Sequence, residues 1–542
     1  MLYEWLAFVS MVSLLSMNIY LNVFNKDPAD SLTPKKNDEL ILKSTFVDES
    51  LLRSSAPQRE LISANTKRPK GNSTAASKKK TSTFVDESLL RSSAPQRELI
   101  SANTKRPKGN STAASKKKMG PPILTRYAIG DEECKRSIND EKFAANISKG
   151  PPILTRYAIG DEECKRSIND EKFAANISKK KTERPDIEVD EKIAVNCEAL
   201  RSRGYYSDSN SDVFSIAYVR IVYKDYHIQE LLFNLMYSPT NIFCYAIDRK
   251  ASAIFHEQMR NLSQCFSNIH VTVTEYDVDS AGHNMDRSYL ECLRLIRKLP
   301  RWKYAILLQN YDIPLRTNRE MIMILKALNG SNDISISVPF SHRIPKHSDW
   351  SYKALQLFKD TSENDNRVLQ IAKGSTAASL SRAFAEFVVD KLNLTIILER
   401  FNKVPYGVDE MLIPTLNSDD NLDAPGGYTR YCINNHSAFI TRYVVWGWSR
   451  LPCKSRRYRH NVCVFGLEDL KTLSSSRYLF ANKMLPQNDY FAISCWAKRL
   501  YNRTHYNHND RSIDVTFYSR LASVRFNSER QKWRANLKAF NC

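Results

Sequence analysis

The sequence predicts an α/β domain with a mostly parallel central sheet at residues 191–505. Short runs rich in β-branched and aromatic residues recur along this part of the chain, as is typical of buried strands. Between them lie segments whose apolar residues follow the period of a helix. Strands that alternate with helices indicate a parallel sheet, because each helix forms the crossover between two strands.

The predicted elements follow one another in a regular order. The first helix is expected to stop before Pro239, since proline breaks the hydrogen-bond ladder of a helix. At the carboxyl ends of strands, where the ligands of such sheets bind, the sequence places Asp248 and Asp312. In chain order we expect strands at 212–223 and 241–250 with a helix at 224–239 between them, then a strand at 269–279, a helix at 286–299, and a strand leading into a loop at 302–315.

Residues 5–24, WLAFVSMVSLLSMNIYLNVF, predict an uncleaved membrane signal anchor. They carry no charge, would span about 30 Å as a helix, and are followed by no small-residue cleavage site. Residues 1–4 would then be a short cytoplasmic tail. Glu4 before the anchor and the lysines after it would, by the positive-inside rule, leave the body of the protein in the cytosol.

Two other features favour a lumenal body instead. The chain has 11 cysteines and no C-x-x-C pattern of a zinc site, which suits an oxidising compartment. It also carries several Asn-x-Ser/Thr sequons, the acceptors of N-glycosylation. The sequons begin at Asn72, Asn110, Asn146, Asn176, Asn261, Asn329, Asn393, Asn435 and Asn502.

Residues 25–190 contain two pairs of identical repeats. The repeated pairs are 44–80 with 82–118, and 120–149 with 150–179. The first pair is rich in Ser, Lys and Pro, the composition of a solvated linker, and supplies nearly half of the net charge of +21. No aromatic-basic platform or groove-reading motif accompanies this charge, so nucleic-acid binding is not expected. We interpret 25–190 as a flexible stem whose repeats reflect a recent duplication or a gene-model fault, and 506–542 as a C-terminal extension.

Two adjacent carboxylates, Asp409 and Glu410, lie in the stretch VPYGVDEMLIPTL at 404–416. Gly407 precedes them, as a residue that often marks the boundary of an element, and an apolar run follows. The segment therefore predicts a helix start. Acidic residues in a first helical turn complement the helix dipole, and solvated charges of that kind are one interpretation. The other interpretation is that one carboxylate is a positioned general base. The segment alone leaves both open.

Seven motifs follow one another between about residues 195 and 500. They are FSIAYVRIVYKD, NIFCYAID, CFSNIHV, WKYAILLQNYDIPLRTN, GVDEMLIPTLN, CVFGLEDL and RYLFANKMLPQNDYFAISC. This order resembles the core-2/I-branching β-1,6-N-acetylglucosaminyltransferase family. The resemblance implies a GT-A-like catalytic domain in the lumen of the Golgi, carried by a single-pass type II membrane protein. It also implies inverting, metal-independent transfer of N-acetylglucosamine from UDP-N-acetylglucosamine to the 6-hydroxyl of a glycan or glycoprotein acceptor.

The resemblance gives roles to individual residues. Glu410 takes the place of the catalytic base, which removes the proton of the attacking hydroxyl, although Val408 replaces the family's proline. Lys483, in LFANKM, matches the lysine that neutralises the departing diphosphate. Asp248 matches the acidic position that helps to hold the uridine end of the donor. A structural strand-end aspartate is the alternative reading of Asp248.

A second diphosphate cation is expected in the segment CKSRRYRHNVC at 453–463. Arg459 is the match for the family arginine. The segment is one residue longer than the family pattern, so Arg456, Arg457 and His460 remain alternatives for this role, and a solvated basic loop remains a further one.

The resemblance also implies a disulfide framework. By position it pairs Cys197 with Cys265, Cys244 with Cys292, and Cys453 with Cys463. Cys495 would pair with either Cys134 or Cys164, which occupy equivalent places in the two copies of one repeat. The other copy's cysteine would be left over beside Cys432 and Cys542.

Three rival hypotheses remain. Asp277 and Asp279, in the motif DVD, could hold a divalent cation on a nucleotide diphosphate. A family member could use another donor, as a xylosyltransferase does. The chain could also be an inactive glycan-binding membrane protein, because the loop SVPFSHRIPKHSDW at 337–350 lacks the family's Lys-Glu-Glu-Arg character.

Overall fold

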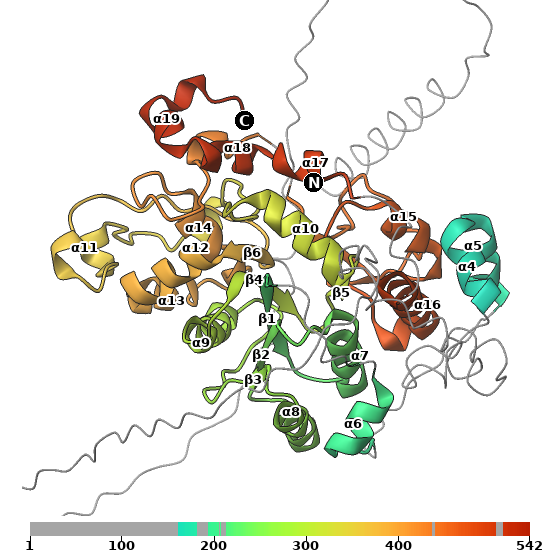
Figure 1. The fold of residues 1–542 in the computed structure, drawn as a ribbon. Coiled ribbons are helices and arrows are strands. Elements are labelled where there is room, and N and C mark those ends of the chain that lie inside the picture. Colours follow the sequence, from blue (N-terminus) through green and yellow to red (C-terminus); the bar gives the residue numbers. More distant parts are fainter. Residues whose placement is uncertain (1–160, 181–192, 205, 207–212, 436–438, 506–512) are drawn as a thin grey trace, which may run out of the picture. The chain divides into compact units, whose positions relative to one another are not determined.

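The computed structural model describes residues 161–180, 193–204, 206, 213–435, 439–505 and 513–542, all within one unit of the chain (Figure 1). Among these residues no helix is both long and apolar enough to cross a bilayer. The predicted anchor at 5–24 and most of the predicted stem lie outside the described residues.

Five strands form the central sheet, in the order β3-β2-β1-β4-β6 (Figure 1). β1 pairs in parallel with β2 and with β4, and β3 pairs in parallel with β2. β6 at the other edge runs antiparallel to β4. The predicted α/β domain with a mostly parallel sheet is confirmed. The strands are β1 (Ser215–Val222), β2 (Ile242–Ile247), β3 (Ile269–Val271), β4 (Trp302–Gln309) and β6 (Ala378–Ser381).

Two predicted helices and three predicted strands are present within a few residues of their expected bounds. The strand predicted at 269–279 is wrong in length, because β3 ends at Val271. The chain then touches the sheet again through an isolated bridge between Tyr276 and Asp248. β3 lies at the sheet edge, and Val273 beyond it is 98% exposed. The alternation of apolar residues there does not reflect a buried face.

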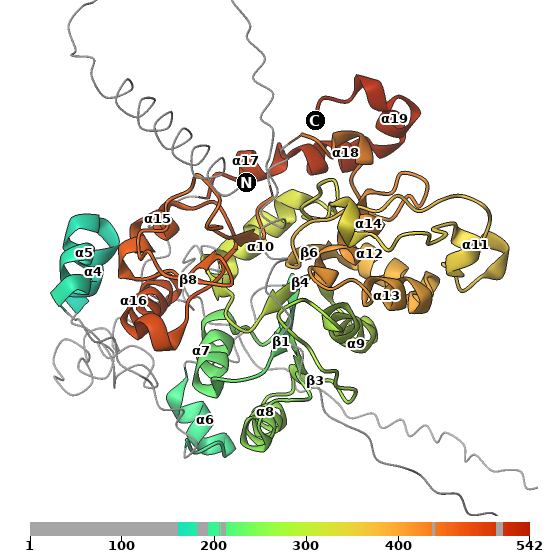
Figure 2. The same ribbon diagram turned by 180° about the vertical axis from the view of Figure 1, so that it is seen from behind.

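Side chains of β1 point alternately into two hydrophobic clusters, one on each face of the sheet. Ile216 and Tyr218 pack in a cluster with side chains of α7 (Tyr226–Met236), α8 (Ala253–Cys265) and α10 (Asn318–Leu328). Ala217 and Val219 pack in a cluster with side chains of α9 (Met285–Arg297), α12 (Arg382–Glu386) and α13 (Thr395–Phe401). Figures 1 and 2 show α7 and α9 on opposite sides of the sheet. Burial on both faces explains why β1 reads as a nearly continuous apolar run.

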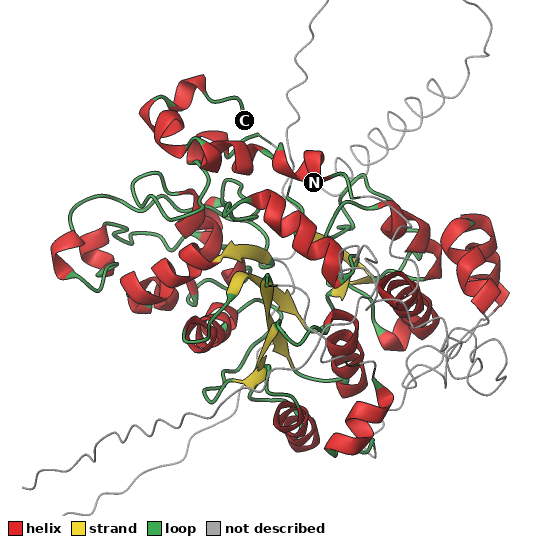
Figure 3. Ribbon diagram, in the orientation of Figure 1, coloured by secondary structure: helices red, strands yellow, loops and turns green. Residues whose placement is uncertain are grey.

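Helices cover the strands on both sides (Figure 3). The helices are α4 (Asp161–Asn169), α5 (Glu171–Lys180), α6 (Cys197–Arg203), α7 (Tyr226–Met236), α8 (Ala253–Cys265), α9 (Met285–Arg297), α10 (Asn318–Leu328), α11 (Tyr352–Leu355), α12 (Arg382–Glu386), α13 (Thr395–Phe401), α14 (Leu412–Ser418), α15 (Leu470–Ser475), α16 (Pro486–His505), α17 (Val515–Ser519), α18 (Ala522–Ser528) and α19 (Arg530–Ala535).

The strand that follows β4 along the chain, β5 (Ile313–Pro314), belongs to a small second sheet. β5 pairs antiparallel with β10 (Phe480–Ala481), and β10 pairs in parallel with β7 (Arg442–Tyr443). A separate hairpin joins β8 (Tyr458–Arg459) to β9 (Val462–Cys463). Because β5 directly follows β4, its pairing brings β10 and β7 to the end of the central sheet.

Five disulfides join the described residues. The three predicted pairs, Cys197–Cys265, Cys244–Cys292 and Cys453–Cys463, are confirmed. Cys495 pairs with Cys164, the cysteine of the second repeat copy, which ties α4 to α16. Cys134 lies outside the described residues.

The expectation that Cys432 and Cys542 are left over is wrong, because they form a disulfide with each other. No local pattern indicates this pairing, because 110 residues separate the two cysteines. They meet because Phe526 and Phe540 of the C-terminal segment pack with Tyr428 in a small apolar cluster that also contains Cys432.

Candidate active site

The four residues predicted for the site line one cleft, with a volume of about 1030 Å³. Asp248 follows β2 directly, at the carboxyl end of the strand. Arg459 lies in β8, Lys483 follows β10, and Glu410 ends the turn before α14. Residues that sequence reasoning selected from four separate motifs therefore share one cavity.

Glu410 is placed by a turn rather than by a regular helix. Val408–Glu410 form a 3-10 turn and α14 begins only at Leu412, so the helix starts slightly later than the sequence suggested. Gly407 before the turn has φ +71°, a conformation that favours glycine, and a Cβ there would lie 2.4 Å from Nη1 of Arg343. Pro414 falls in the first turn of α14, where a missing N–H costs no helical hydrogen bond.

Two cations hold the carboxylate of Glu410 through the same oxygen. Arg343 donates from Nη1 to Oε2 at 2.5 Å, and Lys373 donates from Nζ to Oε2 at 3.1 Å. The guanidinium of Arg343 also lies 5.5 Å from the ring centroids of both Phe340 and Tyr406. Sequence reasoning missed Arg343 and Lys373. The signal in the sequence is that Arg343 lies in the loop at 337–350, which departs from the family's character.

The neighbouring carboxyl, Asp409, has a different environment. It packs against Gly282, where a Cβ would lie 2.0 Å from Oδ1 of Asp409, and the φ of +91° also suits glycine there. Burial, and then the charge of Glu410, raise the pKa of Asp409 to about 6. Burial and the charge of Asp409 raise the pKa of the buried Asp286 well above its ordinary value. The adjacent pair thus consists of one carboxylate paired with cations and one carboxyl beside a buried acid.

A cluster of cations lies at another part of the cleft. Lys483 donates from Nζ to the carbonyl oxygen of Arg459 at 3.4 Å. Arg442, which sequence reasoning missed, also lines the cleft and is 8% exposed. Burial, and then the charges of Arg459 and Arg442, lower the pKa of Lys483 to about 8. Such a concentration of positive charge favours an anionic ligand, because like charges at short range repel.

The structure separates the four candidates for the second diphosphate cation. Arg459 and His460 line the cleft beside Lys483. Arg457 instead donates from Nη1 to the carbonyl oxygen of Asn488 at 3.2 Å. Arg456 is not among the residues that line the cleft. The disulfide between the ends of this segment closes the loop that carries Arg459.

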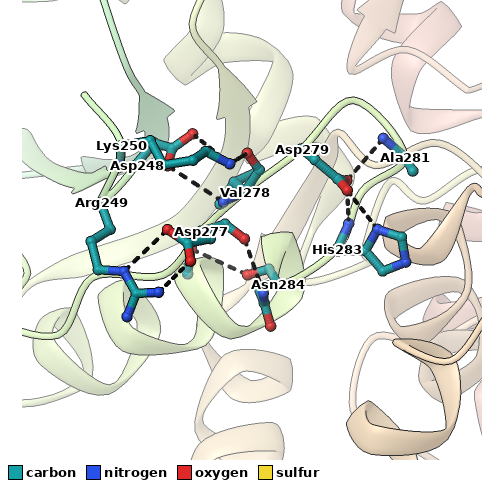
Figure 4. Close-up of polar contacts among 10 residues, drawn as sticks. Asp248, Arg249, Lys250, Asp277, Val278, Asp279, Ala281, His283 and Asn284 are labelled. Carbon is teal, nitrogen blue, oxygen red and sulfur yellow. Dashed lines mark hydrogen bonds and ion pairs between the residues drawn. The ribbon is translucent and has the colours of Figure 1, made fainter. Parts of the chain in front are cut away.

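The carboxylate of Asp248 accepts hydrogen bonds from the backbone at the end of β2 (Figure 4). Its Oδ1 accepts from the backbone N–H groups of Lys250 at 3.0 Å and of Val278 at 3.4 Å. Nζ of Lys250 in turn donates to the carbonyl oxygen of Val278 at 2.7 Å. The carboxylate therefore joins the end of β2 to the segment that follows β3, and it also lines the cleft.

The two carboxylates of the DVD motif have separate partners (Figure 4). Asp277 pairs with Arg249, and Asp279 accepts from Nδ1 of His283 at 2.7 Å. In the described part of the chain, His, Cys, Asp and Glu side chains form no group of three or more that could hold a metal ion.

Aromatic side chains line the mouth of the cleft. Trp446 and Trp448 stack with ring centroids 4.7 Å apart and planes 14° from parallel. Trp448 is 69% exposed, and Phe340 and Tyr406 are about half exposed. Exposed rings at a cavity mouth offer flat apolar faces to a ligand. The repeated tryptophans of VVWGW at 444–448 were a signal that the sequence analysis did not use.

Comparison with known proteins finds one family and several relatives. A model of the Core-2/I-Branching enzyme family matches residues 216–474. The chain is 28% identical over 309 residues to beta-1,3-galactosyl-O-glycosyl-glycoprotein beta-1,6-N-acetylglucosaminyltransferase 3 of Ovis aries, covering 54% of this chain and 69% of that protein. It is 29% identical over 318 residues to N-acetyllactosaminide beta-1,6-N-acetylglucosaminyl-transferase of Homo sapiens, covering 56% and 76%.

Proposed function

Because the chain belongs through residues 216–474 to the core-2/I-branching enzyme family, and is thus a glycosyltransferase, we propose that it makes a β-1,6 linkage. The donor would be UDP-N-acetylglucosamine, and the acceptor would be the 6-hydroxyl of an O-glycan. The observation that carries the proposal is that Glu410 and the cations Arg459 and Lys483 line the same cleft. A base for the acceptor and charge for the leaving diphosphate are the two groups that this reaction requires.

The geometry supports a role for each oxygen of Glu410. In the described structure both cations contact Oε2, and neither contacts Oε1. Oε2 would fix the carboxylate, and Oε1 would accept the proton of the acceptor hydroxyl. The hydroxyl oxygen then forms its bond to the anomeric carbon while the bond from that carbon to the diphosphate breaks. Attack opposite to the leaving group inverts the anomeric configuration.

The departing UDP carries additional negative charge. Lys483 and Arg459 would neutralise that charge, which makes a metal ion unnecessary in this proposal. Asp248 at the strand end would contribute to holding the uridine end, as ligands of parallel sheets bind beyond the carboxyl ends of strands. The stacked Trp446 and Trp448 would offer an apolar platform to a sugar ring of the acceptor.

We further propose a single-pass type II Golgi membrane protein, anchored by residues 5–24 with its catalytic domain in the lumen. Five disulfides among the described residues support an oxidising compartment for this domain. The measurement that tests this is protease protection of the catalytic domain in intact Golgi membranes. Digestion without detergent would contradict the proposed topology.

A donor and acceptor screen tests the proposed reaction. The purified full-length chain is incubated with a panel of UDP-sugars and with O-glycan and N-acetyllactosamine acceptors, and UDP release and product linkage are measured. We expect UDP-N-acetylglucosamine to support β-1,6 transfer in the presence of EDTA. Transfer from UDP-xylose alone would assign another donor, and glycan binding without any transfer would assign a binding protein. Loss of transfer in EDTA would support a metal at Asp277 and Asp279.

A further inference from the structure

Asp312, the second strand-end aspartate in the sequence, lies fully buried between β4 and β5. Its Oδ2 accepts from the backbone N–H of Gln309 at 2.6 Å. Its Oδ1 accepts from Nδ2 of Asn482 at 2.9 Å and lies 3.6 Å from Nη1 of Arg442. A single carboxylate therefore contacts Arg442 and the residue immediately before Lys483.

A buried arginine of the neighbouring strand β1 holds the turn that carries Asp312. Nη2 of Arg220, a fully buried residue of β1, donates to the carbonyl oxygens of Gln309 at 3.0 Å, Asn310 at 3.4 Å and Asp312 at 3.2 Å. These three hydrogen bonds from one nitrogen oppose movement of the turn, because a displaced turn would leave the buried Nη2 group and its carbonyl acceptors unpaired. The position of the Asp312 carboxylate is therefore set by the central sheet itself.

Arg442 depends on the same turn. Its Nη1 donates to Oε1 of Gln309 at 2.7 Å, and its Nη2 donates to Oγ of Ser375 at 3.3 Å. Its Nε is buried and has no hydrogen-bond partner among the described residues. Since Arg442 also lines the cleft, its guanidinium belongs to the same cationic cluster as Arg459 and Lys483.

We propose that Asp312 is a positioning residue of the donor site, whose buried carboxylate orients Arg442 and the Asn482–Lys483 segment toward the diphosphate of a nucleotide sugar. Arg442 is then a further cation for that diphosphate. The inference rests on the proposed function, because it deepens the account of the same cleft. Asp312 does not touch the donor and acts through its neighbours.

The charges around Lys483 give this role a signature of its own. Burial, and then the charges of Arg459 and Arg442, lower the pKa of Lys483 to about 8, and the charge of Asp312 raises it. His460 is a further titratable neighbour, and burial, together with the charges of Lys483 and Arg459, lowers its pKa. Neutralising Asp312 removes its attraction for the charged form of Lys483 and leaves the repulsion from Arg459 and Arg442. Lys483 would then lose its proton at a lower pH.

The experiment measures the dissociation constant of UDP by calorimetry between pH 6.5 and 9 with the full-length chain. Below its pKa Lys483 is charged, so wild-type affinity should fall as the pH rises through about 8. Asp312→Asn should bind UDP about tenfold more weakly at pH 7, the effect of one charge-assisted hydrogen bond, and its affinity should fall at a lower pH. In Lys483→Arg the affinity should not change over this range, because arginine keeps its charge.

A matched control is Asp419→Asn, which neutralises a buried carboxylate that is absent from the lining of the cleft. Asp419 accepts from the backbone N–H of Gln370 at 2.8 Å and from the hydroxyl of Tyr352 at 3.0 Å. We expect it to leave the pH dependence of UDP binding unchanged. If Asp312→Asn behaves like this control, the inference fails while the proposed function stands.

A second variant keeps the test decisive if Asp312→Asn does not fold. Asn482→Ala removes the partner of Oδ1 and leaves the charge of Asp312 in place. We expect weaker UDP binding with the wild-type pH dependence, and unchanged affinity in this variant overturns the inference. If the wild-type chain binds no UDP at any pH, the proposed function fails together with the inference.

Discussion

Nη1 of Arg343 lies 2.5 Å from Oε2 of Glu410, although the two residues are 67 positions apart in the chain. Arg343 comes from the loop after β5 and α10, and Glu410 from the turn before α14. The contact fixes one oxygen of the proposed base, and Glu410 also lines the cleft. The first two predictions follow from this relationship.

Glu410→Gln should lower transfer by about 10²–10⁴, the usual worth of general base catalysis, because an amide does not accept the proton. UDP binding should stay at the wild-type level, since the proposed diphosphate cations are elsewhere in the cleft. The measurement is the rate of transfer together with the dissociation constant of UDP. The control is Asp409→Asn, which should cost much less. Near-normal transfer by Glu410→Gln with none by Asp409→Asn would identify Asp409 as the base instead.

Arg343→Ala should lower kcat by about ten- to a hundredfold, because a charge-assisted hydrogen bond contributes about 1.5–3 kcal/mol. The dissociation constant of UDP should not change. Arg343→Lys is the conservative control, and it should recover part of the loss because it keeps the charge but not the planar contact with Phe340 and Tyr406. A higher kcat in Arg343→Ala would show instead that the ion pair restrains the base.

Asp409→Asn should stabilise the protein at pH 7.5 and not at pH 4. The pKa of Asp409 is raised in the folded state to about 6, above its ordinary 3.8, so the folded state binds the proton more tightly than the unfolded state. Stability from this group is present at low pH and is lost as the pH rises to about 6 and above. Asparagine avoids that loss, with an expected gain of about 1–2 kcal/mol. Urea unfolding at both pH values checks this, and an equal gain at both would contradict it.

Two disulfides should differ in what their removal affects. The bridge of Cys432 and Cys542 closes a span of 110 residues away from the cleft, so its double serine variant should lose about 2–4 kcal/mol of stability and keep its UDP affinity. The bridge of Cys453 and Cys463 closes the loop of Arg459, and Cys453→Ser should be the single cysteine change most harmful to activity. Thermal unfolding and UDP binding measure the two effects. Equal loss of UDP affinity in both variants would contradict the distinction.

Deletion of one copy of each repeat, 82–118 and 150–179, should leave folding and activity intact. Because the copies are identical, deleting 150–179 gives the same sequence as deleting 120–149, and Cys134 then stands at the place of Cys164. Peptide mapping should find this cysteine paired with Cys495. Deletion of both 120–149 and 150–179 is the control, and it should expose the face of α16 that α4 covers. An inactive single-copy chain would show that both copies are needed.

Local patterns allowed much of the fold to be predicted. The central strands are buried on both faces, so their apolar runs are visible in the sequence, as β1 and β4 show. The strand predicted at 269–279 is too long because alternating apolar residues continue past the end of β3, where Val273 at the sheet edge is exposed and not buried. The bridge between Cys432 and Cys542 was missed because it depends on packing between distant segments, which no local pattern records.

For the site, the sequence by itself determined the identity of the chemical groups: Asp248 at a strand end, an acidic pair at a turn, and basic residues in two later motifs. The tertiary structure decided which groups meet. It brought Arg343 and Lys373 to Glu410, and Arg442 to the side of Lys483. The physical reason is that residue type and period act over a few positions, whereas charge pairing and burial depend on distances in space that the packed sheet and its connections set.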